Sequence, residues 1–137
     1  MQQWPSITAG YLAVLALVYA ALAINVVRQR RQNRAAFGDA GNPALRSAIR
    51  AHGHFAEYVP IIALMVAMLE MSGMPGWRVH LLMGVLLVSR LLHPFGMYAT
   101  GSGTFAFRVG RVTGVTLTLL VLIASAVAIL SRVLRGA

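Results

Sequence analysis

Cysteine and lysine are both absent from this chain of 137 residues, and acidic residues number only 3. Without cysteine, the chain has no disulfides, no cysteine-ligated metal and no thiolate of its own. All 12 basic residues are therefore arginines, whose planar fork suits carboxylates better than a lysine ammonium does. Any thiol chemistry at this protein would have to use a thiol supplied by a ligand.

Charge is scarce as well, since charged residues make up 11% of the chain and hydrophobic residues 58%. A soluble domain of this size does not need so many apolar residues, so the composition predicts an integral membrane protein. A net charge of +9 could suggest nucleic acid, but the arginines lie at the ends of apolar segments. We therefore expect membrane lipids and anionic ligands as partners, and no nucleic acid.

Four apolar segments are each long enough to cross a hydrocarbon core, which takes about 20 helical residues. They lie at residues 7–27, 44–71, 77–98 and 108–131. The expected fold is an all-α membrane protein, a four-transmembrane-helix bundle that forms a single domain over residues 1–137. Pro60 lies inside the second segment and predicts a kink just beyond Glu57.

The distribution of arginine predicts the orientation in the membrane. No charge precedes the first apolar segment, whereas RQRRQNR follows it at residues 28–34. This order argues against a signal peptide. The positive-inside rule then predicts that the N-terminus lies outside and that the loops after the first and third segments are cytoplasmic.

One face of the second segment carries most of the ionisable groups within the predicted spans. Arg46, Arg50, His54 and Glu57 are spaced at i, i+4, i+8 and i+11, and Tyr58 lies beside them. Ionisable side chains at membrane depth usually face a bundle interior or a wet cavity. This face is the predicted functional site, and the alternative interpretation is an ion pair that joins two helices.

Other polar groups are predicted to reach the same membrane face. Arg90 and His93 end the third segment, and Arg108 and Arg111 open the fourth, where Gly110 and Gly114 would allow close helix approach. Because arginine does not release its proton, this cluster favours a small ligand with several carboxylates.

A metal ion is the competing ligand for the histidines of this region. His52, His54, Glu57 and His93 are all of ligand type, but only His54 and Glu57 share a helix face, and the spacing is not that of HExxH. The nearby arginines would also repel a cation. We therefore predict no metal.

Two motifs carry a resemblance to a known family. The first motif is RAHGHFAEYVP, within a second helix that begins after GDAGNP. The second motif is RLLHPFGMY, which is followed by a fourth helix that opens with arginine. The chain resembles the MAPEG family of membrane-associated proteins in eicosanoid and glutathione metabolism. The resemblance covers nearly the whole chain and is greatest to small bacterial inner-membrane members.

The resemblance implies a homotrimer that binds glutathione between neighbouring subunits near the cytoplasmic face. On helix two, Arg50, Glu57 and Tyr58 match glutathione-contacting positions, and His54 replaces a usual asparagine. His93 stands at a position where the family has tyrosine or histidine. Arg111 or Arg108 matches the arginine near the thiol, and Arg31 or Arg34 matches a basic residue near a glutathione carboxylate. The helix-three tyrosine of the family is displaced by one residue, so that Met97 stands at its expected position and Tyr98 follows.

The implied activity is that of a glutathione transferase or peroxidase. Glutathione would serve as co-substrate, and its thiolate would attack a lipophilic electrophile or a lipid hydroperoxide. Two alternatives remain open: a small multidrug-type transporter that uses Glu57, and a non-catalytic scaffold that binds lipid or glutathione.

Overall fold

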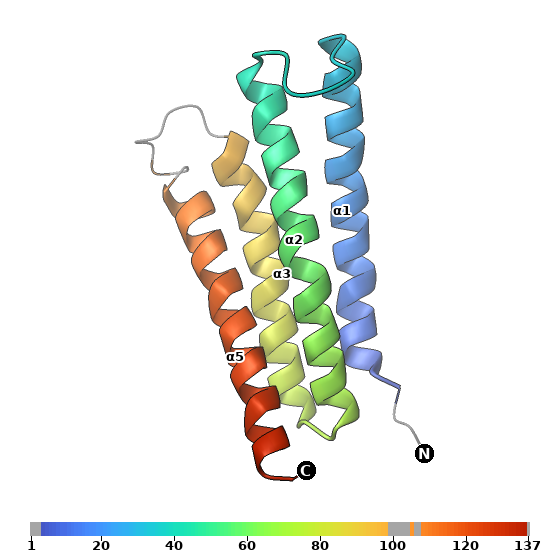
Figure 1. Ribbon diagram of the computed structural model, residues 1–137, viewed down its shortest axis with the longest axis vertical. Helices are drawn as coiled ribbons and strands as arrows, with labels where there is room; N and C mark the ends of the chain where they lie inside the picture. The colour runs from blue at the N-terminus through green and yellow to red at the C-terminus, as the bar shows by residue number, and fades with distance from the viewer. Residues whose placement is uncertain (1–3, 99–104, 106–107, 137) are drawn as a thin grey trace.

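The computed structural model describes residues 4–98, 105 and 108–136, and it contains four long helices (Figure 1). These are α1 (Ser6–Gln32), α2 (Pro43–Met71), α3 (Gly76–Tyr98) and α5 (Gly114–Leu134), the last preceded by the π-helical turn η1 (Arg108–Thr113). Each is long and apolar enough to cross a membrane, η1 and α5 counting as one span. The predicted all-α bundle of four membrane-spanning helices is confirmed.

The helices alternate in direction, so the described ends of the chain lie at one end of the bundle (Figure 1). We call this the terminal end. The opposite end, the loop end, carries the α1–α2 loop, the last turn of α3 and η1. Helices α2 and α3 contact each other and both neighbours, whereas α1 and α5 do not meet within the described residues. The loop end is the predicted cytoplasmic side.

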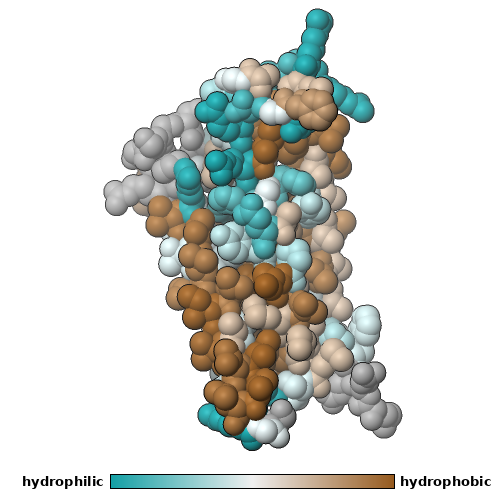
Figure 2. All heavy atoms as spheres, viewed as in Figure 1, coloured by the Kyte–Doolittle hydropathy of each residue, from teal (hydrophilic) through white to brown (hydrophobic). Residues whose placement is uncertain are grey.

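A buried apolar core joins the helices. Leu15, Ile62, Met83 and Leu86 are completely buried in it, and Val121 adds the contribution of α5. Many other apolar side chains point outward, as Leu17 does with 73% of its surface exposed. Figure 2 shows hydrophobic residues over the middle and lower part of one face and hydrophilic residues gathered towards the loop end. This distribution suits a bundle surrounded by lipid.

The α1–α2 loop is held by an asparagine cap. The Asn42 side chain accepts hydrogen bonds from the N–H groups of Ala44 and Leu45, at 2.8 and 3.1 Å, and so satisfies free donors at the start of α2. Its amide nitrogen donates to Asn33 Oδ1 at 2.6 Å. Pro43 takes the first helical position, where its missing N–H costs nothing.

At the terminal end, α2 supplies the cap that α1 lacks. Pro5 precedes α1 and offers no side-chain cap. Instead, the Glu70 carboxylate accepts from the N–H groups of Ile7 and Thr8, at 2.9 and 2.8 Å, and from the Thr8 hydroxyl at 2.6 Å. A carboxylate is favourable there because the helix N-terminus carries a partial positive charge.

The predicted close approach at Gly110 and Gly114 is confirmed, and α3 is the partner. A Cβ atom built on Gly96 would lie 2.6 Å from the Gly110 carbonyl carbon, which is closer than real side chains come. One built on Gly114 would lie 3.0 Å from His93 Cβ. The backbones of α3 and η1 are therefore in direct contact.

Two helices contain an internal proline. Neither α2 at Pro60 nor α3 at Pro94 is interrupted.

Candidate functional site

A cavity of about 280 Å³ opens at the loop end between α2, α3 and η1. We call it the arginine cavity. It is lined by Arg46, Ser47, Arg50, His54, Met97 and Arg111. Three of these lining residues are arginines and none is acidic, so the lining is cationic. An anion is the ligand that such a lining favours.

Helix α2 contributes most of the lining because of its residue spacing. Arg46, Arg50 and His54 follow one another at i+4 steps, and the structure brings them to the same cavity, as the spacing predicts. Glu57 and Tyr58 lie further along α2, outside the cavity lining. Glu57 is exposed, and Tyr58 meets His54 edge to face, with ring centroids 6.5 Å apart.

The first of these arginines is shared with the α1–α2 loop. Arg46 Nε donates to Asp39 Oδ2, and both side chains are partly exposed. This hydrogen bond, together with one from the Gly41 N–H, holds the pKa of Asp39 below its usual value. Among the described side chains, Glu57 forms no ion pair, so the interpretation of this face as an ion pair between two helices finds no support within one chain.

Two histidines meet at the base of the arginine cavity. His54 Nδ1 lies 3.3 Å from His93 Nε2, within hydrogen-bond distance. His93 is 2% exposed and packs against Gly114, whereas His54 reaches the cavity. A hydrogen bond between two imidazoles requires one ring nitrogen to donate and the other to accept. His93 therefore orients His54 and does not itself line the cavity.

Arg90 turns away from the arginine cavity, although the sequence placed it among the ligand-binding candidates. Its side chain is 2% exposed. It donates to the Gly114 carbonyl at 3.3 Å, to the Thr118 hydroxyl, and to the His54 carbonyl at 3.4 Å. Arg90 thus joins three helices through neutral acceptors.

The structure separates the two residues that end α3. Met97 lines the arginine cavity, whereas the Tyr98 hydroxyl accepts a hydrogen bond of 2.8 Å from Asn25 of α1. This agrees with the displacement noted in the sequence, where Met97 occupies the place expected for the tyrosine. Tyr98 does not reach the cavity of its own chain.

Three other predicted arginines lie outside the cavity lining or cannot be placed. Arg31 and Arg34 are exposed at the loop end, where α1 finishes. Arg108 begins η1, but its side chain lies outside the described part of the structure, as do residues 99–104, 106 and 107 of the predicted loop. Arg111 is therefore the described arginine of the fourth span that lines the cavity.

Sequence reasoning missed two lining residues and the local form of η1. Ser47 carries no signal that separates it from other small residues, and Met97 was noted only as standing where the resemblance expects a tyrosine. Arg46 was on the predicted face but was not singled out as a ligand contact. Nothing in RVGRVT predicts a π-helix, a conformation that is rare and often found at functional sites.

The histidines and carboxylates do not gather into a metal centre. In the described part of the chain, no three His, Asp or Glu side chains come together as ligands. His52 stacks on Tyr19 with ring centroids 4.6 Å apart, and His80 lies 3.3 Å from the Tyr11 hydroxyl. Both histidines therefore serve contacts between helices.

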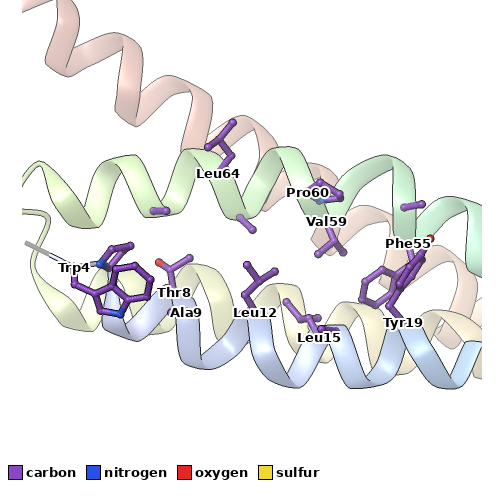
Figure 3. Close-up of a pocket in the computed structure, with 15 residues that line it drawn as sticks. Trp4, Thr8, Ala9, Leu12, Leu15, Tyr19, Phe55, Val59, Pro60 and Leu64 are labelled. Atoms are coloured by element: carbon purple, nitrogen blue, oxygen red, sulfur yellow. The ribbon is translucent and has the colours of Figure 1, made fainter.

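A second hollow, the apolar groove, runs between α1 and α2 on the terminal side of the bundle. It has a volume of about 600 Å³. Figure 3 shows Leu12 and Leu15 of α1 facing Val59 of α2, with Trp4 at one end and Phe55 beside Tyr19 at the other. Its walls are almost entirely apolar, so it suits a hydrocarbon chain or an apolar helix face.

Comparison with known proteins places the chain in a family. A sequence model of the MAPEG family matches residues 8–131. Two curated relatives, each described as inner membrane protein YecN, come from Escherichia coli strains K12 and CFT073. Each is 41% identical over 92 residues, covering 67% of this chain and 70% of the relative. No solved structure matches the chain significantly. The family match over most of the chain, together with four membrane-spanning helices, shows that this integral membrane protein belongs to the MAPEG family.

Proposed function

We propose that this protein binds glutathione in the arginine cavity and activates its thiol towards lipophilic electrophiles or lipid hydroperoxides. The observation that carries the proposal is the cavity lining, which contains three arginines and no acidic residue. Glutathione offers two carboxylates, one ammonium group and one thiol. Its carboxylates would bind guanidinium groups of this lining through charge-assisted hydrogen bonds.

The arrangement of α2 supports a specific orientation of glutathione. Arg50 lines the cavity, and a guanidinium can bind a carboxylate through two parallel hydrogen bonds. Glu57 lies two helical turns further along α2 and has no ion-pair partner among the described side chains. It is suited to bind the ammonium group of the same ligand. Arg50 and Glu57 would therefore position glutathione and take no part in proton transfer.

Arg111 is suited to activate the thiol. It reaches the arginine cavity from η1, opposite the α2 arginines. A guanidinium near the sulfur favours the thiolate, which is the reactive nucleophile. The thiolate would form a C–S bond with an electrophile as the leaving group departs. With a hydroperoxide, sulfur would take the terminal oxygen to give an alcohol and a sulfenic acid, which a second glutathione would convert to the disulfide and water.

The lipophilic substrate would arrive by a different route. The loop end carries the charged cavity, whereas the sides of the bundle expose apolar side chains. Glutathione would therefore come from water and its co-substrate from the bilayer. In the proposed orientation the N-terminus is outside and the cavity faces the cytoplasm, in the inner membrane, where the name of the two relatives places them.

A homotrimer would complete the site. The cavity of about 280 Å³ is at the lower limit of ligand pockets, which usually start at roughly 300 Å³. Arg50 and Glu57 are exposed in the single chain, while Arg31 and Arg34 lie at the same end without lining the cavity. A neighbouring subunit could add one of these arginines to the ligand's second carboxylate.

The proposal is tested on the purified protein in detergent. Isothermal titration measures glutathione binding, and two assays measure turnover, one with an aromatic electrophile and one with a fatty-acid hydroperoxide. We expect binding and at least one activity. Binding without turnover would favour the scaffold interpretation, and absence of binding would overturn the proposal. Substrate-stimulated proton flux in proteoliposomes, lost in Glu57→Gln, would favour a transporter.

A further inference from the structure

Arg90 is a buried charge that the proposed chemistry does not use. With 2% of its surface exposed, it is not part of the lining of the arginine cavity. We propose that Arg90 is a positioning residue that fixes the η1 turn and so directs Arg111 into the cavity. The part of this inference that concerns Arg111 and the thiol rests on the proposed function, whereas the part that concerns the η1 turn does not.

The burial of Arg90 requires an explanation. Taking a guanidinium out of water is costly, and a carboxylate usually compensates for it. All the Arg90 contacts found among the described residues are instead to neutral oxygens, those of Ser89, Thr118, Gly114 and His54. An apolar side chain of similar size would pack there without the desolvation cost. The hydrogen bonds of Arg90 must therefore do something that an apolar residue cannot.

Those hydrogen bonds converge on the junction between η1 and α5. Gly114 is the first residue of α5, directly after the π-helical turn. Its carbonyl accepts from Arg90 and also from the Thr118 hydroxyl, the latter at 2.7 Å, and Thr118 itself accepts from Arg90. Ser89 Oγ lies 3.1 Å from Thr118 Oγ1 and extends the network into α3. The junction is thus tied to α3 through Arg90 and Ser89.

The same guanidinium also reaches α2. Its Nη1 lies 3.4 Å from the carbonyl of His54, a residue that lines the cavity. Arg90 therefore links the cavity wall on α2 with the start of α5. A lysine, with one ammonium group, could not span these acceptors in the same geometry.

Because Arg111 lies in the π-helical turn, the hydrogen bonds of Arg90 at the end of this turn affect the direction of the Arg111 side chain. In a π-helix the hydrogen bonds run from i to i+5, so residues face other directions than in an α-helix. Arg111 lies inside this turn, three residues before Gly114. Gly96 packs directly on Gly110 and so holds the turn from one side. Arg90 holds its end, and the two contacts together set where Arg111 points.

Two buried threonines provide a matched test. Thr118 is a residue with 1% of its surface exposed, and Thr118→Val removes its hydroxyl from the Arg90 network. Thr8 is 2% exposed, and Thr8→Val removes a hydroxyl at the terminal end. Both changes keep side-chain shape. Arg90→Lys is the third variant, because it keeps the charge and loses the fork. All three variants are compared with the unmodified chain.

The first measurement needs no glutathione. Hydrogen exchange is followed by mass spectrometry in detergent for peptides that contain residues 108–113. We expect exchange there to accelerate about fivefold to tenfold in Thr118→Val and Arg90→Lys, as loss of one buried hydrogen bond implies, and to stay unchanged in Thr8→Val. Equal exchange in Thr118→Val and Thr8→Val would overturn the inference, even if glutathione does not bind.

The second measurement follows the ultraviolet absorbance of the bound thiolate against pH. We expect its midpoint to move to higher pH in Thr118→Val, by a few tenths of a unit to about one unit, and not in Thr8→Val. If hydrogen exchange at residues 108–113 accelerates but the pH midpoint of the thiolate absorbance stays unchanged, the turn does not position Arg111. That result would overturn the inference. Absence of any glutathione signal in the unmodified chain would instead count against the proposed function. The charged and titratable groups around the cavity are unchanged in both threonine variants: Arg46, Arg50, His54, Glu57, Arg90, His93, Arg111.

Discussion

His54 Nδ1 lies 3.3 Å from His93 Nε2, so that a residue lining the arginine cavity is oriented by a buried residue of the neighbouring helix. His93→Phe would keep an aromatic ring at this position and remove this partner. We expect it to weaken glutathione binding about fivefold, because one hydrogen bond is typically worth that much. Isothermal titration measures the change. His80→Phe, at the terminal end, is the control, and equal losses in both variants would refute the assigned role.

Arg50 and Glu57 are expected to be essential for ligand binding. Arg50→Ala and Glu57→Ala should each abolish measurable glutathione binding, because each removes the counter-charge for one end of the ligand. Both residues are exposed in the single chain, so the helices should stay folded. Size-exclusion chromatography with light scattering checks the oligomer, and Arg78→Ala at the terminal end is the control. Unchanged affinity in both variants would contradict the site.

Arg111 is expected to control the ionisation of the glutathione thiol and not the affinity for glutathione. Arg111→Ala should reduce the thiolate absorbance of bound glutathione at neutral pH while the complex still forms. Arg108→Ala tests the other arginine that opens the fourth span. If Arg108→Ala alone lowers the absorbance, the roles of the two arginines are exchanged. If neither change does, the fourth span takes no part in activation.

The contact between Gly96 and Gly110 predicts a large effect from one added methyl group. Gly96→Ala would place Cβ 2.6 Å from the Gly110 carbonyl carbon and force α3 and η1 apart. Overpacking of this kind typically costs about 1–3 kcal/mol. Gly84→Ala is a matched control on the same helix, because its Cβ would meet only the Tyr11 hydroxyl, at 3.6 Å. Thermal unfolding in detergent should show a lower midpoint for Gly96→Ala alone.

Asp39 offers a direct test of the loop. It is the only aspartate in the sequence, so ¹³C-labelled aspartate gives a single carboxyl signal. The hydrogen bond from Arg46 lowers the pKa of Asp39. Because the folded-state pKa is the lower one, this pair stabilises the loop above the unfolded-state pKa and stops doing so as pH falls through the folded-state pKa. In Arg46→Gln the signal should titrate at higher pH, and an unchanged titration would show that the pair does not form in solution.

The helices and much of the charged face were predictable from the sequence because each depends on local pattern. Uncharged apolar runs mark the spans, and i+4 spacing brings Arg46, Arg50 and His54 to one cavity. Such features need no knowledge of how distant segments pack.

What could not be predicted depends on contacts between distant segments. Arg90 carries the same charge as its neighbours, and only the packing of α5 against α3 supplies the Thr118 hydroxyl that turns it inward. The backbone of η1, a π-helical turn, lies directly against Gly96, a contact that a single sequence does not reveal. Glu70 likewise resembled an ordinary residue flanking a turn before its hydrogen bonds to α1 were known.

The Glu70 cap makes the first two spans depend on each other during membrane insertion. The exposed N–H groups of α1 and the negative charge of α2 are each unfavourable in lipid, and each satisfies the other once both helices are present. The two therefore enter the bilayer most favourably as a hairpin, on which α3 and α5 can then assemble.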